Sequence, residues 1–265
     1  MSRFAASPRL EVPGVRAVSR RFVIGSSATL PLAGCDEDAA WPINLVSSAT
    51  VERLGRESWQ RIVAETPQSR DPARSDAVRT IVRKLLVSAG EDVGRWQVAV
   101  FARDDINAFA LPGGRIGVFE GMFRVADTPG KLAAVLGHEI GHVQSRHGQE
   151  RMNAEALRDL GFRVLFTVMQ LGDVPQANRI AAVLGAGVDF GLLLPYSRRQ
   201  ELEADRRGLA LMTRSGFQGQ EALALWRRME AMDGQAGPTF LATHPSPSQR
   251  IKALEEQLQM EAPNG

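Results

Sequence analysis

The chain of 265 residues has a single cysteine, Cys35, so no disulfide can form within one molecule. Long apolar runs are also scarce, because beyond Cys35 no stretch reaches the 18 uncharged apolar residues that a membrane-spanning helix needs. The apolar fraction of 44% and the charged fraction of 23% are typical of globular proteins. These values exclude a wholly disordered or fibrous chain and predict one compact domain with appendages.

Most of the chain also lacks an excess of charge of either sign. The formal net charge is +2, but residues 1–34 contain five arginines and one acidic residue. The remaining residues carry 27 basic and 29 acidic side chains, a net charge near −2. A protein that binds nucleic acid through its phosphates needs a concentrated positive surface. We therefore expect no nucleic-acid partner.

The N-terminal residues carry the features of a bacterial export signal in the required order. Arg20 and Arg21 precede twelve apolar or small residues from Phe22 to Ala33, which are too few to span a bilayer stably. Leu-Ala-Gly-Cys at residues 32–35 resembles a lipobox, in which the cysteine is lipidated and becomes the mature N-terminus. The paired arginines resemble, more weakly, a twin-arginine signal. The alternative is a frayed helix with an incidental cysteine.

This order of features predicts three regions: a signal peptide over 1–34, a lipidated N-terminus and linker over 35–46, and a folded domain over 47–260. A lipid on Cys35 would tether the domain to a membrane on the periplasmic side of a bacterial envelope. The sequence leaves open whether that membrane is the inner or the outer one. It also leaves open the choice between Sec and twin-arginine export, and the oligomeric state.

Histidine is scarce, with four in the chain, yet two of them lie in the HExxH pattern at residues 138–142. Imidazoles four residues apart on a helix lie about 40° apart around its axis, so His138 and His142 can bind one metal ion. Glu139 lies beside them and can accept a proton from a water on that metal. The segment therefore supplies two ligands and a general base of a hydrolytic zinc site.

A catalytic zinc usually has three protein ligands, so a third must come from elsewhere in the chain. Glu201 and Asp205 are four residues apart on one helix face, so one carboxylate can bind the metal while the other orients a ligand histidine. Glu203 lies on roughly the opposite side. We predict Glu201 as the ligand and Asp205 as the orienting residue. The alternative is an exposed helix of salt bridges, which the neighbouring arginines favour.

The two remaining histidines have different expected roles. His147 lies nine residues after His138, about 180° away on a continuous helix, so we predict a solvated or capping side chain. His244 precedes Pro245, outside regular helix. It can stabilise the oxyanion, occupy the open metal position at rest, or have a structural role in its loop, and the sequence leaves these three roles open.

Apolar periodicity and turn residues predict a mainly helical α+β domain. Pro112-Gly113-Gly114 marks a turn between two strands, and we expect a small antiparallel sheet flanking the helix with the histidine pair. The expected strands cover about 96–102, 106–111 and 115–119. The expected helices cover about 47–65, 71–90, a segment from 128 through the histidine pair, two segments within 154–194, then 197–215, 219–232 and 246–260.

Four ordered motifs carry a resemblance to a known family. They are His-Glu-Ile-Gly-His at 138–142, the segment 197–205 with Glu201 and Asp205, His-Pro at 244–245 with Arg-Ile at 250–251, and the strand and turn at 107–114. Together they resemble the HtpX-like and CAAX-prenyl-protease-like zinc metallopeptidases, which are gluzincins with a glutamate as third ligand. The match covers about residues 45–255. Because the membrane helices of HtpX and the prenyl proteases are missing from the sequence, the resemblance is to a soluble lipoprotein branch of bacterial envelopes.

The resemblance implies a role for each residue of the site. His138, His142 and Glu201 would bind one Zn²⁺ per chain, Glu139 would act as general base and proton donor, and Asp205 would orient His138. It implies a zinc endopeptidase of envelope protein quality control, whose substrates are proteins or peptides in extended conformation. The strand at the edge of the cleft would pair with the substrate backbone through Asn107, Ala108, Phe109 and Ala110.

Two other functions remain in competition with this hypothesis. One is a non-proteolytic periplasmic chaperone or assembly factor that uses the same cleft, although such a protein does not need the base Glu139. The other is a closed structural zinc site, which normally has four ligands and for which only His244 is available as the fourth.

We also expect the apolar segments near 160–194 to act as a lid over the cleft.

Overall fold

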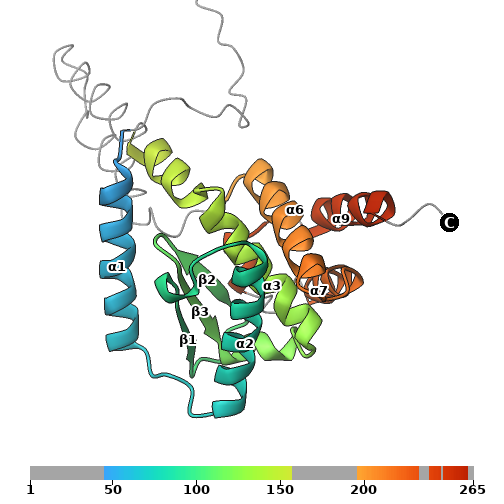
Figure 1. The fold of residues 1–265 in the computed structure, drawn as a ribbon, viewed down its shortest axis with the longest axis horizontal. Helices are drawn as coiled ribbons and strands as arrows, with labels where there is room; N and C mark the ends of the chain where they lie inside the picture. Colours follow the sequence, from blue (N-terminus) through green and yellow to red (C-terminus); the bar gives the residue numbers. More distant parts are fainter. Residues whose placement is uncertain (1–44, 157–195, 233–238, 246, 262–265) are drawn as a thin grey trace, which may run out of the picture. The chain divides into compact units, whose positions relative to one another are not determined.

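A computed structural model of the chain describes residues 45–156, 196–232, 239–245 and 247–261. The predicted signal peptide, Cys35, most of the linker, most of the two helices expected within 154–194 and the lid expected near 160–194 lie outside the described residues. The described helices are α1 Ser48–Glu65, α2 Pro72–Ser88, α3 Pro129–Gln144, α6 Arg198–Arg214, α7 Gln220–Ala231, α8 Thr239–Thr243 and α9 Pro247–Glu261. The strands are β1 Gln97–Phe101, β2 Ala108–Leu111 and β3 Arg115–Phe119 (Figure 1). Residues 147–156 are also helical.

The helices begin where side chains of the sequence can cap them. The Asp71 carboxylate accepts the backbone N–H of Ala73 at 2.9 Å, and proline at the first position of α2 needs no N–H partner. Thr128 caps α3 in the same way through the N–H of Lys131. Ser197 and Gln200 form a reciprocal capping box that fixes the start of α6. Both helices of the site therefore have a defined first turn.

The sheet is mixed, so the prediction of an antiparallel sheet was correct for only one of its two strand pairs. The strand order is β1-β3-β2, with β2 antiparallel and β1 parallel to β3. The turn between β2 and β3 contains Gly113 and Gly114 with φ of 83° and 77°, which glycine adopts without strain. The longer segment between β1 and β2 lets β3 insert between them, an order that alternation within each strand does not reveal. The α+β class itself is confirmed.

Helix α3 is the central element of the described structure. It packs against β2 and against helices α2, α6 and α7, and Figure 1 shows it crossing α6 at close range. A Cβ on Gly141 would lie 2.8 Å from the carbonyl oxygen of Ala204, and a Cβ on Gly208 would lie 2.8 Å from the backbone nitrogen of His138. These two glycines therefore let the backbones of α3 and α6 approach each other at the level of the histidine pair.

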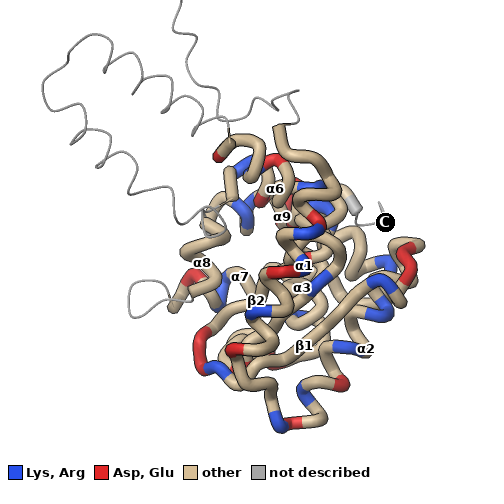
Figure 2. Tube along the Cα trace, turned by 90° about the vertical axis from the view of Figure 1, so that its left-hand side faces the viewer, with Lys and Arg blue, Asp and Glu red and all other residues tan. Residues whose placement is uncertain are grey.

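The main core surrounds α3 and includes fully buried side chains from every layer, such as Leu85, Ile116, Leu136, Leu209 and Trp226. Basic and acidic positions are interspersed along the described chain, in agreement with its near-neutral charge (Figure 2). No helix within the described ranges is both long enough and apolar enough to cross a bilayer.

Candidate metal centre

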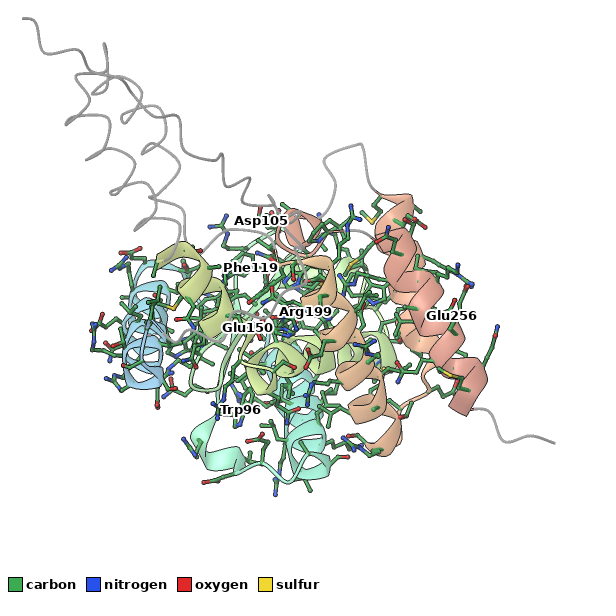
Figure 3. All side chains as sticks on the ribbon, turned by 90° about the horizontal axis from the view of Figure 1, so that it is seen from above. Trp96, Asp105, Phe119, Glu150, Arg199 and Glu256 are labelled. Carbon is green, nitrogen blue, oxygen red and sulfur yellow. The ribbon has the colours of Figure 1, made fainter. Side chains whose placement is uncertain are left out.

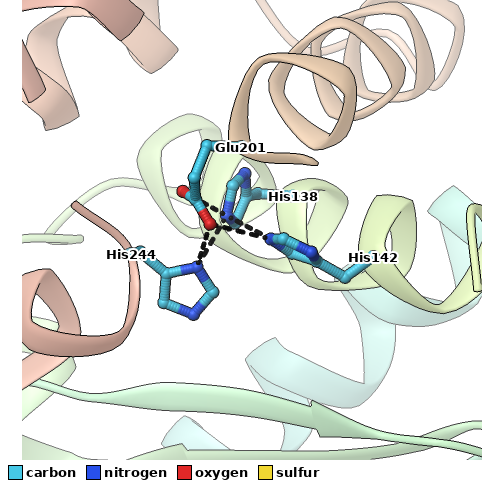
Figure 4. Close-up of side chains that lie close together, drawn as sticks. All are labelled: His138, His142, Glu201 and His244. Carbon is cyan, nitrogen blue, oxygen red and sulfur yellow. Dashed lines mark hydrogen bonds and ion pairs between the residues drawn. The ribbon is translucent and has the colours of Figure 1, made fainter. Parts of the chain in front are cut away.

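The two histidines of the HExxH pattern lie in the second half of α3 and face the same side. Both are buried, with 1% and 2% of their surface exposed for His138 and His142. Their Nε2 atoms lie 3.0 Å apart (Figure 4). Because α3 is surrounded by core, the histidine pair is held by packing on the remaining faces of the helix.

Helix α6 brings Glu201 to this pair across 59 residues of sequence. The Glu201 side chain is fully buried, and its Oε1 lies 3.3 Å from the Nε2 of His142. Its Oε2 lies 3.5 Å from the Nε2 of His138. Glu203 lies away from the pair, and its carboxylate accepts a hydrogen bond from Ser145 at 2.8 Å. The predicted distinction between the two glutamates therefore agrees with the geometry.

His244 joins the cluster from the loop after α8. Its Nδ1 lies 3.1 Å from the Nε2 of His138 and 3.0 Å from the Oε1 of Glu201. Its ring stacks on Phe240 with centroids 4.2 Å apart, and its Nε2 lies 3.5 Å from the Oε1 of Glu139. Figure 4 shows the four side chains converging from three elements, and one ligand atom from each lies within 4.8 Å of the others.

The chemistry of this cluster fits a divalent cation. Burial, together with the charge of Arg250, lowers the pKa of His138 to about 4, and burial lowers the pKa of His142 well below its usual value. Both imidazoles are therefore neutral near pH 7, the form in which histidine binds a metal. Nitrogen lone pairs that face one another at about 3 Å repel unless a proton or a cation lies between them. Three imidazoles and one carboxylate form a nitrogen and oxygen ligand set that suits zinc.

Asp205 lies behind His138, on the side away from the cluster. Its Oδ1 lies 2.9 Å from the Nδ1 of His138, so the carboxylate can accept the Nδ1–H and leave Nε2 free for a metal. This contact places Asp205 where the sequence predicts an orienting residue.

Arg250 is a buried member of the site whose role the sequence analysis missed. Its Nε lies 2.6 Å from Asp205, its Nη1 lies 2.6 Å from Glu201, and its guanidinium lies 3.5 Å from the Trp226 ring centre. Burial alone would raise the pKa of both carboxyls, but the charge of Arg250 outweighs it and holds both pKa values below their usual range. The available signal is an arginine six residues after His244, which in the sequence indicates only the family resemblance.

Glu139 has the environment of a group that exchanges protons near neutral pH. It is 1% exposed, and burial raises its pKa to about 7. The backbone of Ala110 lies close enough to the carboxylate to lower its pKa, while Oε1 has no hydrogen-bond partner within the described part of the chain and lies 3.5 Å from the Nε2 of His244. A carboxylate with one oxygen free of hydrogen bonds and a pKa near the working pH is suited to general base catalysis.

His147 contradicts the prediction of a solvated or capping side chain, because it is fully buried. Its Nδ1 lies 2.9 Å from the Nδ1 of His142. The prediction was wrong because it assumed that α3 continues, whereas α3 ends at Gln144 and Arg146 adopts a left-handed φ of 56°. Because of this turn, His147 does not continue the helical path of α3, and its side chain points back toward His142. Left-handed backbone at an arginine has no clear sequence signal.

The predicted substrate strand is only partly at the site. Strand β2 is an edge strand, and Ala110 and Leu111 line a cavity of about 220 Å³ together with His142 and Tyr196. Asn107, Ala108 and Phe109 are not among the residues that line this cavity. Ala108 belongs to the main core, and the Phe109 ring packs over Gly117. The side chain of Tyr196, which the sequence analysis did not consider, stacks on His142 with centroids 3.9 Å apart.

Comparison with known proteins gives a family match. A sequence model of peptidase family M48 matches residues 72–258. Mitochondrial metalloendopeptidase OMA1 of Schizosaccharomyces pombe is 33% identical over 220 residues, which cover 81% of this chain and 63% of that protein. The beta-barrel assembly-enhancing protease of Yersinia pestis is 31% identical over 196 residues, which cover 71% of this chain and 40% of that protein. OMA1 of Saccharomyces cerevisiae is 29% identical, covering 77% of this chain and 63% of that protein.

The chain thus spans less than two thirds of the length of these curated relatives. The match confirms the metallopeptidase resemblance at the level of the family, whose members use zinc. These relatives are named OMA1 and β-barrel assembly-enhancing protease. They therefore do not support a particular similarity to HtpX or to the prenyl proteases within the family.

Proposed function

The chain belongs to peptidase family M48, and on that premise we propose that it is a zinc-dependent endopeptidase that cuts proteins of a bacterial envelope. The observation that carries the proposal is the meeting of His138, His142 and Glu201 at one buried point, with Glu139 beside them. The three side chains would hold the metal. Glu139, with its pKa near 7, would act on the water that attacks the peptide bond.

A bound Zn²⁺ supplies Lewis-acid polarisation of the scissile carbonyl and of the attacking water. The residues of the chain supply the proton transfers and the orientation. Glu139 would accept a proton from the attacking water on Oε1, which has no hydrogen-bond partner in the described structure, and would deliver it to the leaving amine. Asp205 keeps the proton of His138 on Nδ1, and Arg250 balances the buried negative charges.

Strand β2 and the adjacent cavity are the proposed binding site for the substrate. An edge strand can pair with an extended peptide through main-chain hydrogen bonds. Ala110 lies on this strand and also contacts Glu139, so a peptide along β2 would pass the catalytic base. The cavity of about 220 Å³ beside Leu111 and His142 would accept a substrate side chain.

We propose that His244 occupies the fourth metal position at rest and leaves it when substrate binds. Its Nδ1 lies as close to His138 and Glu201 as these residues lie to each other, which favours this role over a purely structural one. A resting state of this kind lowers the apparent activity, because only molecules in which His244 has left the metal position can bind substrate there.

His244→Ala is therefore expected to raise kcat/KM for casein hydrolysis, by about 10-fold if about one molecule in ten is open at rest. The measurement is casein cleavage by zinc-loaded wild type and variant, with Thr243→Ala, at the last residue of α8, as the control. Loss of activity in His244→Ala with zinc retained would instead assign His244 to oxyanion stabilisation. Absence of metal-dependent cleavage in both the wild type and the variant would overturn the proposed peptidase.

The biological setting of the proposal is quality control of misfolded or misassembled envelope proteins. The names of the relatives, a metalloendopeptidase of mitochondria and a protease that enhances β-barrel assembly, support such a role. The export features of residues 1–34 and the Leu-Ala-Gly-Cys box support a periplasmic location with a lipid anchor on Cys35.

Replacement of Cys35 by serine is expected to abolish lipidation and to release the protein from membranes. Mass spectrometry of the mature wild-type N-terminus should find a lipidated cysteine, and fractionation should find the variant in the soluble fraction. A wild-type mature N-terminus at another residue, without lipid, would contradict the lipoprotein proposal and leave the peptidase proposal intact.

A further inference from the structure

His147 lies directly behind His142, on the side away from the metal-binding cluster. The Nδ1 atoms of the two rings are 2.9 Å apart, and the ring planes are inclined by 72°. His147 is fully buried, although its neighbour Arg146 is exposed. This contact gives His142 a partner at its outer nitrogen, as Asp205 does for His138.

The short distance between the two Nδ1 atoms fixes the roles of the rings. Two imidazole nitrogens at 2.9 Å share one proton, so one donates and the other accepts. If His142 binds a metal through Nε2, its proton must be on Nδ1, and it donates to His147. His147 then accepts on Nδ1 and has its own proton on Nε2.

The Nε2 of His147 faces a carboxylate that is itself held in place. It lies 3.5 Å from the Oε2 of Glu203, which is longer than a normal hydrogen bond, so the carboxylate acts on the Nε2–H dipole of the neutral ring through its negative charge. Oε1 of Glu203 accepts hydrogen bonds from Ser145 at 2.8 Å and from Arg207 at 3.1 Å. The position of Glu203 is thus set by α6 and by the end of α3 together.

Polar contacts connect the two segments that carry this pair. Arg199 of α6 contacts Glu150 at 2.7 Å, and Gln200 contacts the same carboxylate at 2.8 Å. Both contacts join α6 to the helical segment that begins at His147, and Figure 3 labels Arg199 and Glu150. This ion pair and this hydrogen bond therefore connect the segment that carries His147 to the helix that carries Glu203.

We propose that His147 and Glu203 are positioning residues that hold His142 in the tautomer and orientation that bind the metal through Nε2. The inference rests on the proposed zinc function and adds two residues to it. Neither residue touches the metal or the substrate. Orienting partners of metal-ligating histidines typically contribute 10-fold to 100-fold in metal affinity or activity.

The test measures zinc affinity rather than peptidase activity. The dissociation constant is obtained at one fixed pH by competition with a chromophoric chelator, and the visible absorption spectrum of the Co²⁺-loaded protein reports the ligand geometry. His147→Leu is expected to raise the dissociation constant for zinc by about 10-fold to 100-fold. His147→Asn, whose Oδ1 can accept a hydrogen bond at the position of the lost Nδ1, should recover most of this loss.

Glu203→Gln provides a second measurement, since it keeps an acceptor for Ser145 but removes the negative charge that faces the Nε2–H of His147. It should weaken zinc binding less than His147→Leu does. The double variant should bind zinc no more weakly than His147→Leu alone, because the two residues act through one contact. If His147→Leu does not fold, the His147→Asn and Glu203→Gln proteins carry the test, and Glu203→Gln must still bind zinc more weakly than the wild type.

Several results would overturn the inference. One is unchanged zinc affinity and an unchanged Co²⁺ spectrum in His147→Leu and Glu203→Gln. Another is an equal loss in His147→Leu and His147→Asn, which would indicate packing alone. Both require that the wild type binds zinc and are therefore distinct from failure of the proposed function. A folded wild type that binds no zinc would remove the proposed function and this inference together.

Discussion

Replacing Glu139 with glutamine is expected to lower kcat/KM for casein hydrolysis by about 10²-fold to 10⁴-fold, the range for general acid–base catalysis, while zinc content stays at the wild-type level. Glutamine has nearly the same shape, so the packing around this 1% exposed side chain is preserved. It cannot accept a proton from water at neutral pH. The loss should therefore appear in kcat, with little change in KM.

A matched control is Glu57→Gln, which makes the same chemical change at a side chain that is 49% exposed and paired with Arg53. Its activity should equal that of the wild type. The Glu139→Gln comparison also separates an enzyme from a chaperone that holds chains in the same cleft. Equal casein cleavage by Glu139→Gln and wild type would reject the mechanism, whereas suppression of aggregation without any cleavage in either protein would favour the chaperone.

Replacing Arg250 with methionine is expected to be strongly destabilising. The guanidinium is 1% exposed and pairs with Glu201 and Asp205, so its removal leaves two buried carboxylates without their main cation. Breaking a buried ion pair in this way costs about 3–5 kcal/mol. For a domain of this size each kcal/mol lowers Tm by about 2–4 °C, so we expect a decrease of about 6–20 °C.

The measurement is thermal unfolding of the zinc-free and zinc-loaded proteins. Arg227→Met is the matched control, because Arg227 pairs with Glu255 but is 60% exposed, and exposed pairs contribute less than about 1 kcal/mol. A Tm for Arg250→Met within the range of this control would contradict the account of the buried charges. Zinc should raise the Tm of Arg250→Met more than it raises the Tm of the wild type. In the variant, Glu201 has lost the positive charge of Arg250, and a bound cation would replace it.

The candidate ligands could be selected from the sequence because their spacing is local. His138 and His142 are related by helix geometry alone, and Glu201 was chosen over Glu203 because only Glu201 has Asp205 four residues later. The structure brings these residues together and separates Glu203 from them. The sequence does not indicate why α3 and α6 lie so close together. In the structure, glycines on both helices allow their backbones to approach.

The features that escaped prediction depend on the path of the backbone between elements. His147 was misplaced because Arg146 turns the chain in a left-handed conformation that arginine rarely adopts. The role of Arg250 depends on how α9 packs against α6, which no spacing within one helix indicates. The direction of β1 depends on strand order, and alternation of apolar residues is the same in parallel and antiparallel edges.

The central claim is that one zinc ion is bound by His138, His142 and Glu201, with His244 at the fourth position in the resting protein. X-ray absorption at the zinc edge of the purified wild type tests it most directly. The account predicts one zinc per chain with nitrogen and oxygen ligands only, at about 2.0–2.2 Å. A protein that retains no zinc, or a zinc ion with a sulfur ligand from the single cysteine, would contradict it.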